Sequence, residues 1–156
     1  MKNSIETEGL SREFDDFWAV DNLDLAIEPG TFYGCPGRNG AGKSTTMRIL
    51  VGYMPATSGQ VRIYGIDVFD DPPRAKKKID YLPEVPPVYI DMTVQEYLSF
   101  VGRIKGVGRG QTLKAEVVRV AELAGVDHIL PRLIRNISKG YRQRVGIAQA
   151  LLNDPE

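Results

Sequence analysis

The sequence is poor in the residue types on which disulfide frameworks and many metal sites depend. It contains one cysteine, Cys35, and one histidine, His128, among its 156 residues. An internal disulfide, a cysteine-based zinc cluster and a histidine-rich metal site are therefore excluded within this sequence. Cys35 is expected to be a small buried apolar residue without a redox role. His128 is expected on the surface or in a loop.

Excess charge and long hydrophobic runs are also missing. The 20 Lys and Arg residues balance the 20 Asp and Glu residues, so no overall field attracts nucleic acid or an anionic membrane. No run of about 18 apolar residues predicts a transmembrane helix. The N-terminus lacks the apolar core of a secretion signal, which predicts a cytoplasmic chain. The Lys76-Lys77-Lys78 run is interpreted as a solvated helix face, and no nucleic-acid partner is expected.

The strongest motif that the sequence does contain is a phosphate-binding loop. Residues 37–45 read GRNGAGKST, which fits the pattern G-x-x-x-x-G-K-[ST]. The glycines allow backbone N–H groups to turn toward anionic oxygens, Lys43 can reach the β and γ phosphates, and Ser44 can bind Mg²⁺. The alternative from the residues alone is a glycine-rich turn in front of a helix.

The residues around this loop support the phosphate-binding interpretation. Residues 31–35 follow a Pro-Gly turn and are predicted to form a strand. Downstream, Met47, Leu50 and Val51 have helical spacing and predict a short helix with one apolar face, stopped by Gly52. A strand, a glycine-rich loop and a helix are the arrangement that this chemistry needs.

Further elements flank the loop on both sides. Alternating apolar residues predict strands at 22–27 and 60–64, which with a first strand near residues 5–10 would form an antiparallel layer. Asp71 and Pro72 predict a helix start, and residues 79–82 predict a strand that Pro83 ends.

The second half of the chain is predicted to be helical. Thr93 and Glu96 form a capping-box pattern in front of one helix, and Gly125 is placed to end a second. A third helix follows Ser138. The apolar residues expected to share one face of each helix are Val94, Tyr97, Leu98 and Val101; Leu113, Val117, Val120 and Ala124; and Val145, Ala148 and Leu152.

Together with the loop, the segment Ser138-Lys139-Gly140-Tyr141-Arg142-Gln143 resembles the signature motif of ABC transporter ATP-binding subunits. The likeness runs along the whole chain, and residues 81–87 and 92–98 are similar to ATPases paired with ABC-2-type export permeases. The resemblance implies an α/β P-loop NTPase fold with an antiparallel β layer and an inserted helical subdomain. It divides the chain into an ATP-binding core at 1–86, a helical subdomain at 87–136, and the signature motif with its helix at 137–156.

The resemblance also implies a site for ATP and Mg²⁺. Phe14 would stack on adenine, with core packing as its alternative, and Ser44 and Glu84 would hold Mg²⁺. Ser138, Gly140 and Gln143 would serve a second nucleotide-binding domain packed head to tail. A membrane permease would be the other partner and would place the chain on the cytoplasmic membrane face. The residues expected to hold the phosphates are Gly37, Asn39, Gly40, Ala41, Gly42, Lys43, Ser44 and Thr45.

The sequence departs from the family pattern at the approach to the loop and after its signature helix. Cys35 and Pro36 replace the usual aliphatic pair before the loop, so the end of that strand should be weakened, and Arg38 replaces a proline within the loop. The Walker B carboxylates and the switch histidine do not occur, which predicts a fragment that lacks the C-terminal part of the core sheet and has no catalytic residue of its own. The alternatives to an exporter ATPase are a module that binds ATP without hydrolysing it and a remnant that does not fold stably.

Overall fold

The computed structural model describes residues 3–153 and divides between Ile79 and Asp80 into two compact units. The first unit contains β1 (Ile5–Phe14), β2 (Phe17–Ile27), α1 (Lys43–Leu50), β3 (Ser58–Ile63), β4 (Ile66–Asp67) and α2 (Pro72–Lys76). The second contains α3 (Val94–Ile104), α4 (Gly110–Ala124), α5 (Lys139–Ala150) and the 3-10 turns η1 (Asp127–Ile129) and η2 (Ile134–Asn136). The predicted division after residues 86 and 136 stays a prediction.

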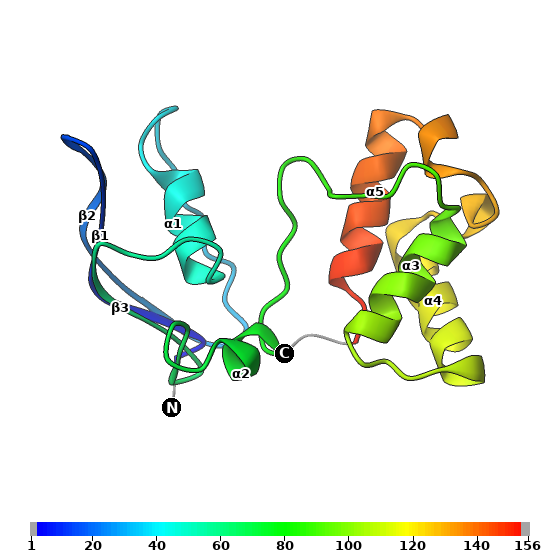
Figure 1. The fold of residues 1–156 in the computed structure, drawn as a ribbon, viewed down its shortest axis with the longest axis horizontal. Coiled ribbons are helices and arrows are strands. Elements are labelled where there is room, and N and C mark those ends of the chain that lie inside the picture. Colours follow the sequence, from blue (N-terminus) through cyan, green and yellow to red (C-terminus); the bar gives the residue numbers. More distant parts are fainter. Residues whose placement is uncertain (1–2, 154–156) are drawn as a thin grey trace. The chain divides into compact units, whose positions relative to one another are not determined.

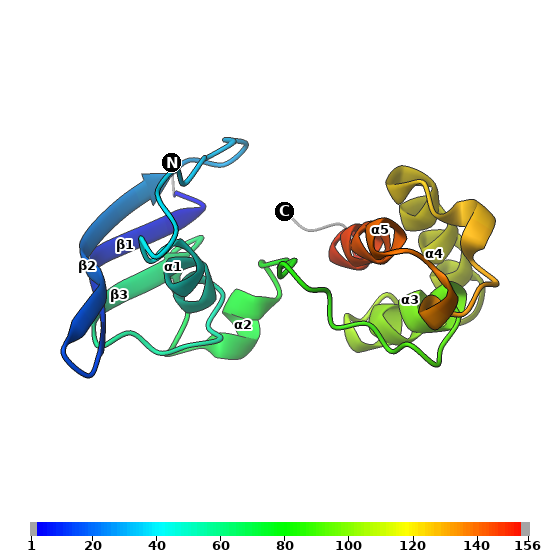
Figure 2. The same ribbon diagram turned by 90° about the horizontal axis from the view of Figure 1, so that it is seen from above.

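The first unit is an antiparallel sheet of strand order β2-β1-β3-β4 with α1 against one face (Figures 1 and 2). Alternate residues of β3, Val61 and Ile63, are buried, as the apolar alternation predicts. They form an apolar cluster with Leu10 of β1 and with Ile49 and Leu50 of α1. The predicted antiparallel layer is confirmed.

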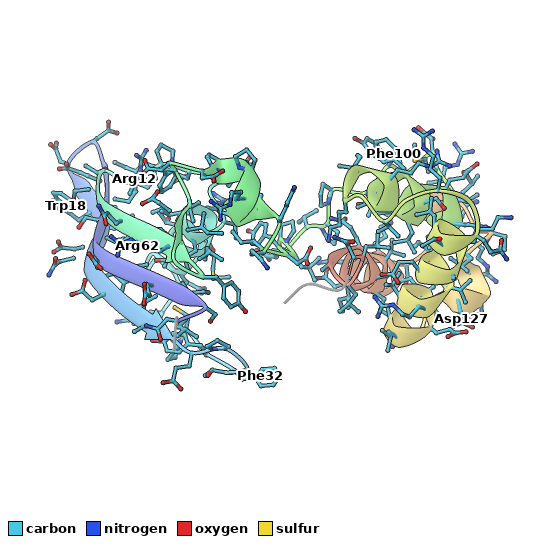
Figure 3. The ribbon with its side chains drawn as sticks, turned by 90° about the horizontal axis from the view of Figure 1, so that it is seen from below. Arg12, Trp18, Phe32, Arg62, Phe100 and Asp127 are labelled. Atoms are coloured by element: carbon cyan, nitrogen blue, oxygen red, sulfur yellow. The ribbon has the colours of Figure 1, made fainter. Side chains whose placement is uncertain are left out.

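The strand predicted for residues 31–35 does not form in the described part of the chain. Residues 31–40 are all exposed, and the side chain of Phe32 extends away from its unit (Figure 3). A strand needs a neighbour to pair its backbone groups, and no described strand lies beside this segment. Cys35 lies in this segment and is exposed, so the prediction that it is buried is wrong. The strand predicted at residues 79–82 is also absent.

The apolar face predicted for α1 is correct only in part. Leu50 is buried as expected, but Met47 is 44% exposed and Thr46 takes the inward position. The Thr46 hydroxyl donates to the carbonyl oxygen of Gly42 at 3.0 Å, which satisfies its polar group inside the unit.

The second unit is a helical cluster whose ends follow the predicted caps. Thr93 and Glu96 form a complete capping box at α3, and Gly125 ends α4 with a φ of 65°. The faces predicted for the three helices meet in one core, to which Tyr97, Leu98, Val117, Val145 and Leu152 belong. No helix among residues 3–153 is long and apolar enough to cross a bilayer.

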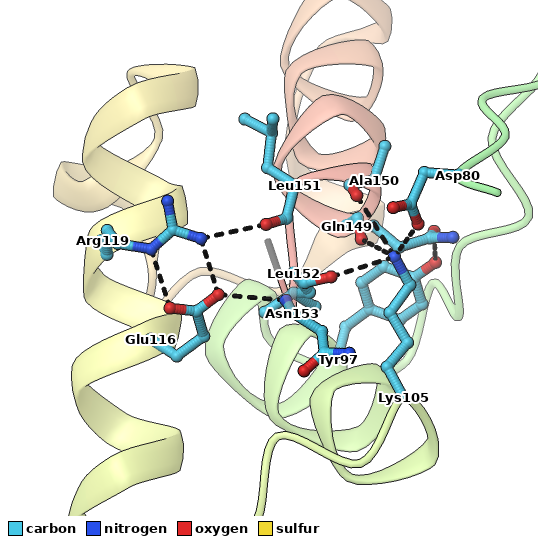
Figure 4. A network of polar contacts seen from close by, with 10 residues as sticks. All are labelled: Asp80, Tyr97, Lys105, Glu116, Arg119, Gln149, Ala150, Leu151, Leu152 and Asn153. Carbon is cyan, nitrogen blue, oxygen red and sulfur yellow. Dashed lines mark hydrogen bonds and ion pairs between the residues drawn. The ribbon is translucent and has the colours of Figure 1, made fainter. Parts of the chain in front are cut away.

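Polar contacts tie the C-terminal end of α5 to the other two helices (Figure 4). Lys105 pairs with Asp80 and donates to the carbonyl oxygens of residues 149, 150 and 152 at 3.1, 3.2 and 3.3 Å. On the other side, Arg119 donates to the Leu151 carbonyl at 3.1 Å. Tyr97 bonds to Gln149, and burial raises the pKa of the Tyr97 hydroxyl to about 12.

Candidate functional site

The glycine-rich loop leads into the first turn of α1 and packs closely on β2. Gly42 precedes α1 with a φ of 75° and offers no side chain to cap the helix. The N–H groups of the first turn therefore have no side-chain acceptor at this position, as suits a site for an anion. A Cβ atom on Gly42 would lie 1.9 Å from the carbonyl oxygen of Ala19, so only glycine allows this approach to β2.

Lys43 is held by the loop that precedes it. Its ammonium group donates to the carbonyl oxygen of Gly37 at 2.6 Å and to that of Arg38 at 2.7 Å. The loop also closes on itself, since the N–H of Ala41 donates to the Arg38 carbonyl at 3.2 Å. These two carbonyl groups thus hold the Lys43 ammonium group beside the start of α1.

A pocket of about 500 Å³ opens over this loop and is lined by Phe14, Phe17, Ala19 and residues 39–45. Phe14 and seven of the eight residues predicted to hold phosphates line it. The eighth, Gly37, is not part of the lining but accepts a hydrogen bond from Lys43. The lining carries one ammonium group and no carboxylate, which suits polyphosphate oxygens. Ser44 also lines the pocket and offers a hydroxyl, a hard oxygen ligand of the kind that Mg²⁺ accepts.

Phe14 lies at the end of β1 on this pocket and is 38% exposed. The guanidinium of Arg12 lies 4.6 Å from the centre of its ring, a distance at which a cation attracts the ring face. This position favours the predicted contact with a base over its alternative, plain core packing.

Phe17 and Ala19 line the pocket but were not predicted from the sequence. Both follow the Asp15-Asp16 turn, and Phe17 is paired with Phe14 across the β1–β2 ladder. The length of that turn is the signal that could have identified Phe17, because a two-residue hairpin places its flanking residues opposite each other.

The remaining predicted site residues lie in the second unit. Glu84 is exposed in the segment before α3. Ser138 caps α5 by accepting from the N–H of Tyr141 at 3.3 Å, Gly140 lies in the first turn, and Gln143 is half-buried on the same helix. Since Ser44 belongs to the first unit, a magnesium site shared by Ser44 and Glu84 stays a prediction. Within residues 3–153, no cluster of three or more His, Cys, Asp or Glu side chains forms a metal site.

His128 is exposed to solvent in η1, as expected for a surface residue. Its Nε2 atom lies 3.1 Å from the hydroxyl oxygen of Tyr141, the residue that follows Gly140 on α5. The two rings pack edge to face at 5.7 Å. His128 therefore supports the first turn of α5.

Comparisons with known proteins match nearly the whole chain to ATP-binding proteins of ABC transporters. A family model described as ABC transporter matches residues 20–156. The bacitracin transport ATP-binding protein BcrA of Bacillus licheniformis is 36% identical over 100% of this chain and 50% of its own length. The daunorubicin/doxorubicin resistance ATP-binding protein DrrA of Streptomyces peucetius is 34% identical over 98% of this chain and 46% of its own length.

Solved structures give the same fold. The structure of an ATP-binding subunit of an ABC transporter superposes with a TM-score of 0.82 at 27% identity and covers 95% of this chain and 61% of its own. The ATP-binding cassette MJ0796, a dimer bound to ADP and Pi, gives a TM-score of 0.86 at 23% identity and covers 97% of this chain and 70% of its own. The chain spans about half the length of several of the curated relatives it matches.

Proposed function

We propose that this chain, which belongs to the ABC transporter family, is the nucleotide-binding part of a subunit that couples ATP binding and hydrolysis to export. The observation that carries the proposal is the pocket that joins Phe14 to the Lys43 loop. An aromatic ring at one end and an ammonium group with free helix N–H groups at the other match the two ends of a nucleoside triphosphate.

In this proposal the loop binds the phosphates through Lys43 and the N–H groups at the start of α1. Lys43 exchanges the carbonyl oxygens of Gly37 and Arg38 for phosphate oxygens, which are stronger acceptors for an ammonium group. The N–H groups at the start of α1 donate to the same phosphates. Mg²⁺, held by Ser44 and the phosphates, would neutralise charge that develops during phosphoryl transfer.

The proposed partners are a second nucleotide-binding domain and a membrane permease on the cytoplasmic side. Ser138, Gly140 and Gln143 would meet the γ-phosphate bound by the second domain, and Glu84 would contribute to Mg²⁺ binding. The dimeric form of MJ0796 supports the first partner. The names of BcrA and DrrA, a transport and a resistance ATP-binding protein, support a role in export.

The first test is the replacement of Lys43. We expect Lys43→Ala to weaken Mg·ATP binding by about 1.5–3 kcal/mol, because it removes a charged donor from the phosphates. Titration of a fluorescent ATP analogue measures the effect. Lys76→Ala is the control, since Lys76 is an exposed lysine of the same unit outside the pocket. Equal affinities for wild type and Lys43→Ala would reject the site.

A second candidate function is nucleotide binding without turnover by these 156 residues. It is favoured by the pocket lining, which contains no carboxylate or imidazole that could position an attacking water. We therefore expect phosphate release by the purified chain to equal that of its Lys43→Ala variant while wild type still binds ATP. Steady release that disappears in Lys43→Ala would show that another carboxylate, such as Glu84, acts as the base. A cooperative melt distinguishes both functions from a chain that does not fold stably.

A further inference from the structure

Phe17 faces the same pocket as Phe14. The two residues flank the Asp15-Asp16 turn and are direct partners in the β1–β2 ladder. Residues directly opposite each other on antiparallel strands project to the same face of the sheet, with Cβ atoms about 5 Å apart. Both side chains line the pocket over the loop. Two aromatic side chains from paired positions therefore line the same pocket.

The alternation along β2 supports this placement. Ala19, two residues after Phe17, also lines the pocket, whereas Trp18 between them does not. Trp18 is paired with Glu13 in the ladder and is 46% exposed. Since successive strand residues face opposite sides of a sheet, Trp18 belongs to the other face. It provides a matched control for an exposed aromatic residue of the same strand.

The chemistry at the aromatic end differs from that at the loop. Phe14, Phe17 and Ala19 offer ring faces and a methyl group, and their side chains have no hydrogen-bonding atoms. The polar side chains of the lining all come from the loop and from the start of α1: Asn39, Lys43, Ser44 and Thr45. Phe17 is 60% exposed, so its ring is available to an apolar, flat group of a ligand.

One side of the neighbouring ring is already occupied. Arg12 packs over Phe14 and donates to the carbonyl oxygen of Pro55 at 3.2 Å, and Arg12 is not part of the pocket lining. The face of the Phe14 ring turned away from Arg12 remains open to a ligand in the pocket that Phe17 also lines. The two rings can enclose a flat group from two directions.

We infer that Phe17 is a second base-contacting residue, which with Phe14 forms an aromatic corner for the purine ring of the bound nucleotide. The inference rests on the proposed function, since the loop must hold the triphosphate. Because the corner recognises ring area and not the hydrogen-bonding edge of the base, it accepts adenine and guanine alike.

Calorimetric titration of the 156-residue chain with ATP, GTP and inorganic tripolyphosphate tests the inference. We expect Phe17→Ala to weaken ATP and GTP binding by about tenfold, the size of effect that loss of a stacked ring produces. Tripolyphosphate has no base, so its affinity should not change. Phe17→Tyr should keep the wild-type affinity for ATP, and Trp18→Ala should behave as wild type. Phe17→Leu keeps apolar bulk without a ring and should weaken ATP even if Phe17→Ala does not fold.

The outcomes separate the inference from the function on which it rests. Wild-type ATP affinity in both Phe17→Ala and Phe17→Leu would overturn the inference. Equal losses for ATP and tripolyphosphate would overturn it too, because Phe17 would then shape the loop and not contact the base. If wild type bound neither ligand, or if Lys43→Ala bound both as wild type does, the proposed function would fail as well.

Discussion

Replacing Gly42 by alanine should abolish nucleotide binding and lower the free energy of unfolding of the first unit. The added Cβ would lie 1.9 Å from the Ala19 carbonyl oxygen, which is backbone and cannot rotate away. The φ of 75° adds strain for any residue with a side chain. Backbone strain of about 1–3 kcal/mol and overpacking of about 1–3 kcal/mol together predict a loss of about 2–6 kcal/mol.

The control for this experiment is Gly40→Ala in the same loop. Gly40 also has a positive φ, 85°, but a Cβ added there meets no atom within 4 Å. Gly40→Ala should therefore cost only the backbone strain of about 1–3 kcal/mol. Denaturant unfolding and ATP titration of both variants measure the difference. Equal losses would show that the contact between the loop and β2 contributes nothing beyond the glycine backbone.

Local patterns predict those parts of the fold whose partners are close in sequence. The caps at Thr93 and Gly125 depend on a residue and its near neighbours, and both occur as predicted. The alternation of Val61 and Ile63 identifies a strand because both side chains face the apolar cluster, although one of its two neighbours in the sheet, β1, is distant in sequence.

The strand predicted at residues 31–35 shows where this reasoning ends. Its apolar residues satisfy the pattern of a buried strand, but a strand also needs a neighbour with which to pair. No strand of the described residues lies beside it, and the segment stays exposed. Met47 is exposed although it fits the apolar face predicted for α1. Thr46 is buried in its place, and its hydroxyl is satisfied there by the hydrogen bond to the Gly42 carbonyl.

The pocket required tertiary information of a different kind. The loop motif identifies Lys43 and Ser44 because each residue type has its own role on a phosphate. Phe17 carries no motif, and an exposed aromatic residue beside a turn has no obvious role. The two-residue turn could have placed Phe17 opposite Phe14, but only the folded structure brings Phe17 over the loop.

The contacts of Lys105 predict the second large effect. We expect Lys105→Met to lower the free energy of unfolding of the helical unit by about 3–4 kcal/mol. The Lys105 side chain is 23% exposed and that of Asp80 18% exposed, so loss of the ammonium leaves a largely buried carboxylate unpaired. It also leaves the carbonyl oxygens of residues 149, 150 and 152 at the end of α5 without this donor.

Methionine keeps the apolar stem of Lys105, so the loss can be assigned to the ammonium group and not to packing. Asp80→Asn is the matched variant: it removes the ion pair but leaves the three bonds from Lys105 to α5. It should therefore cost less than Lys105→Met, and the double variant should cost less than the sum of the two. Circular dichroism during urea unfolding measures all three. If Asp80→Asn alone accounted for the whole loss, the ion pair would stabilise the unit and the contacts to the end of α5 would not.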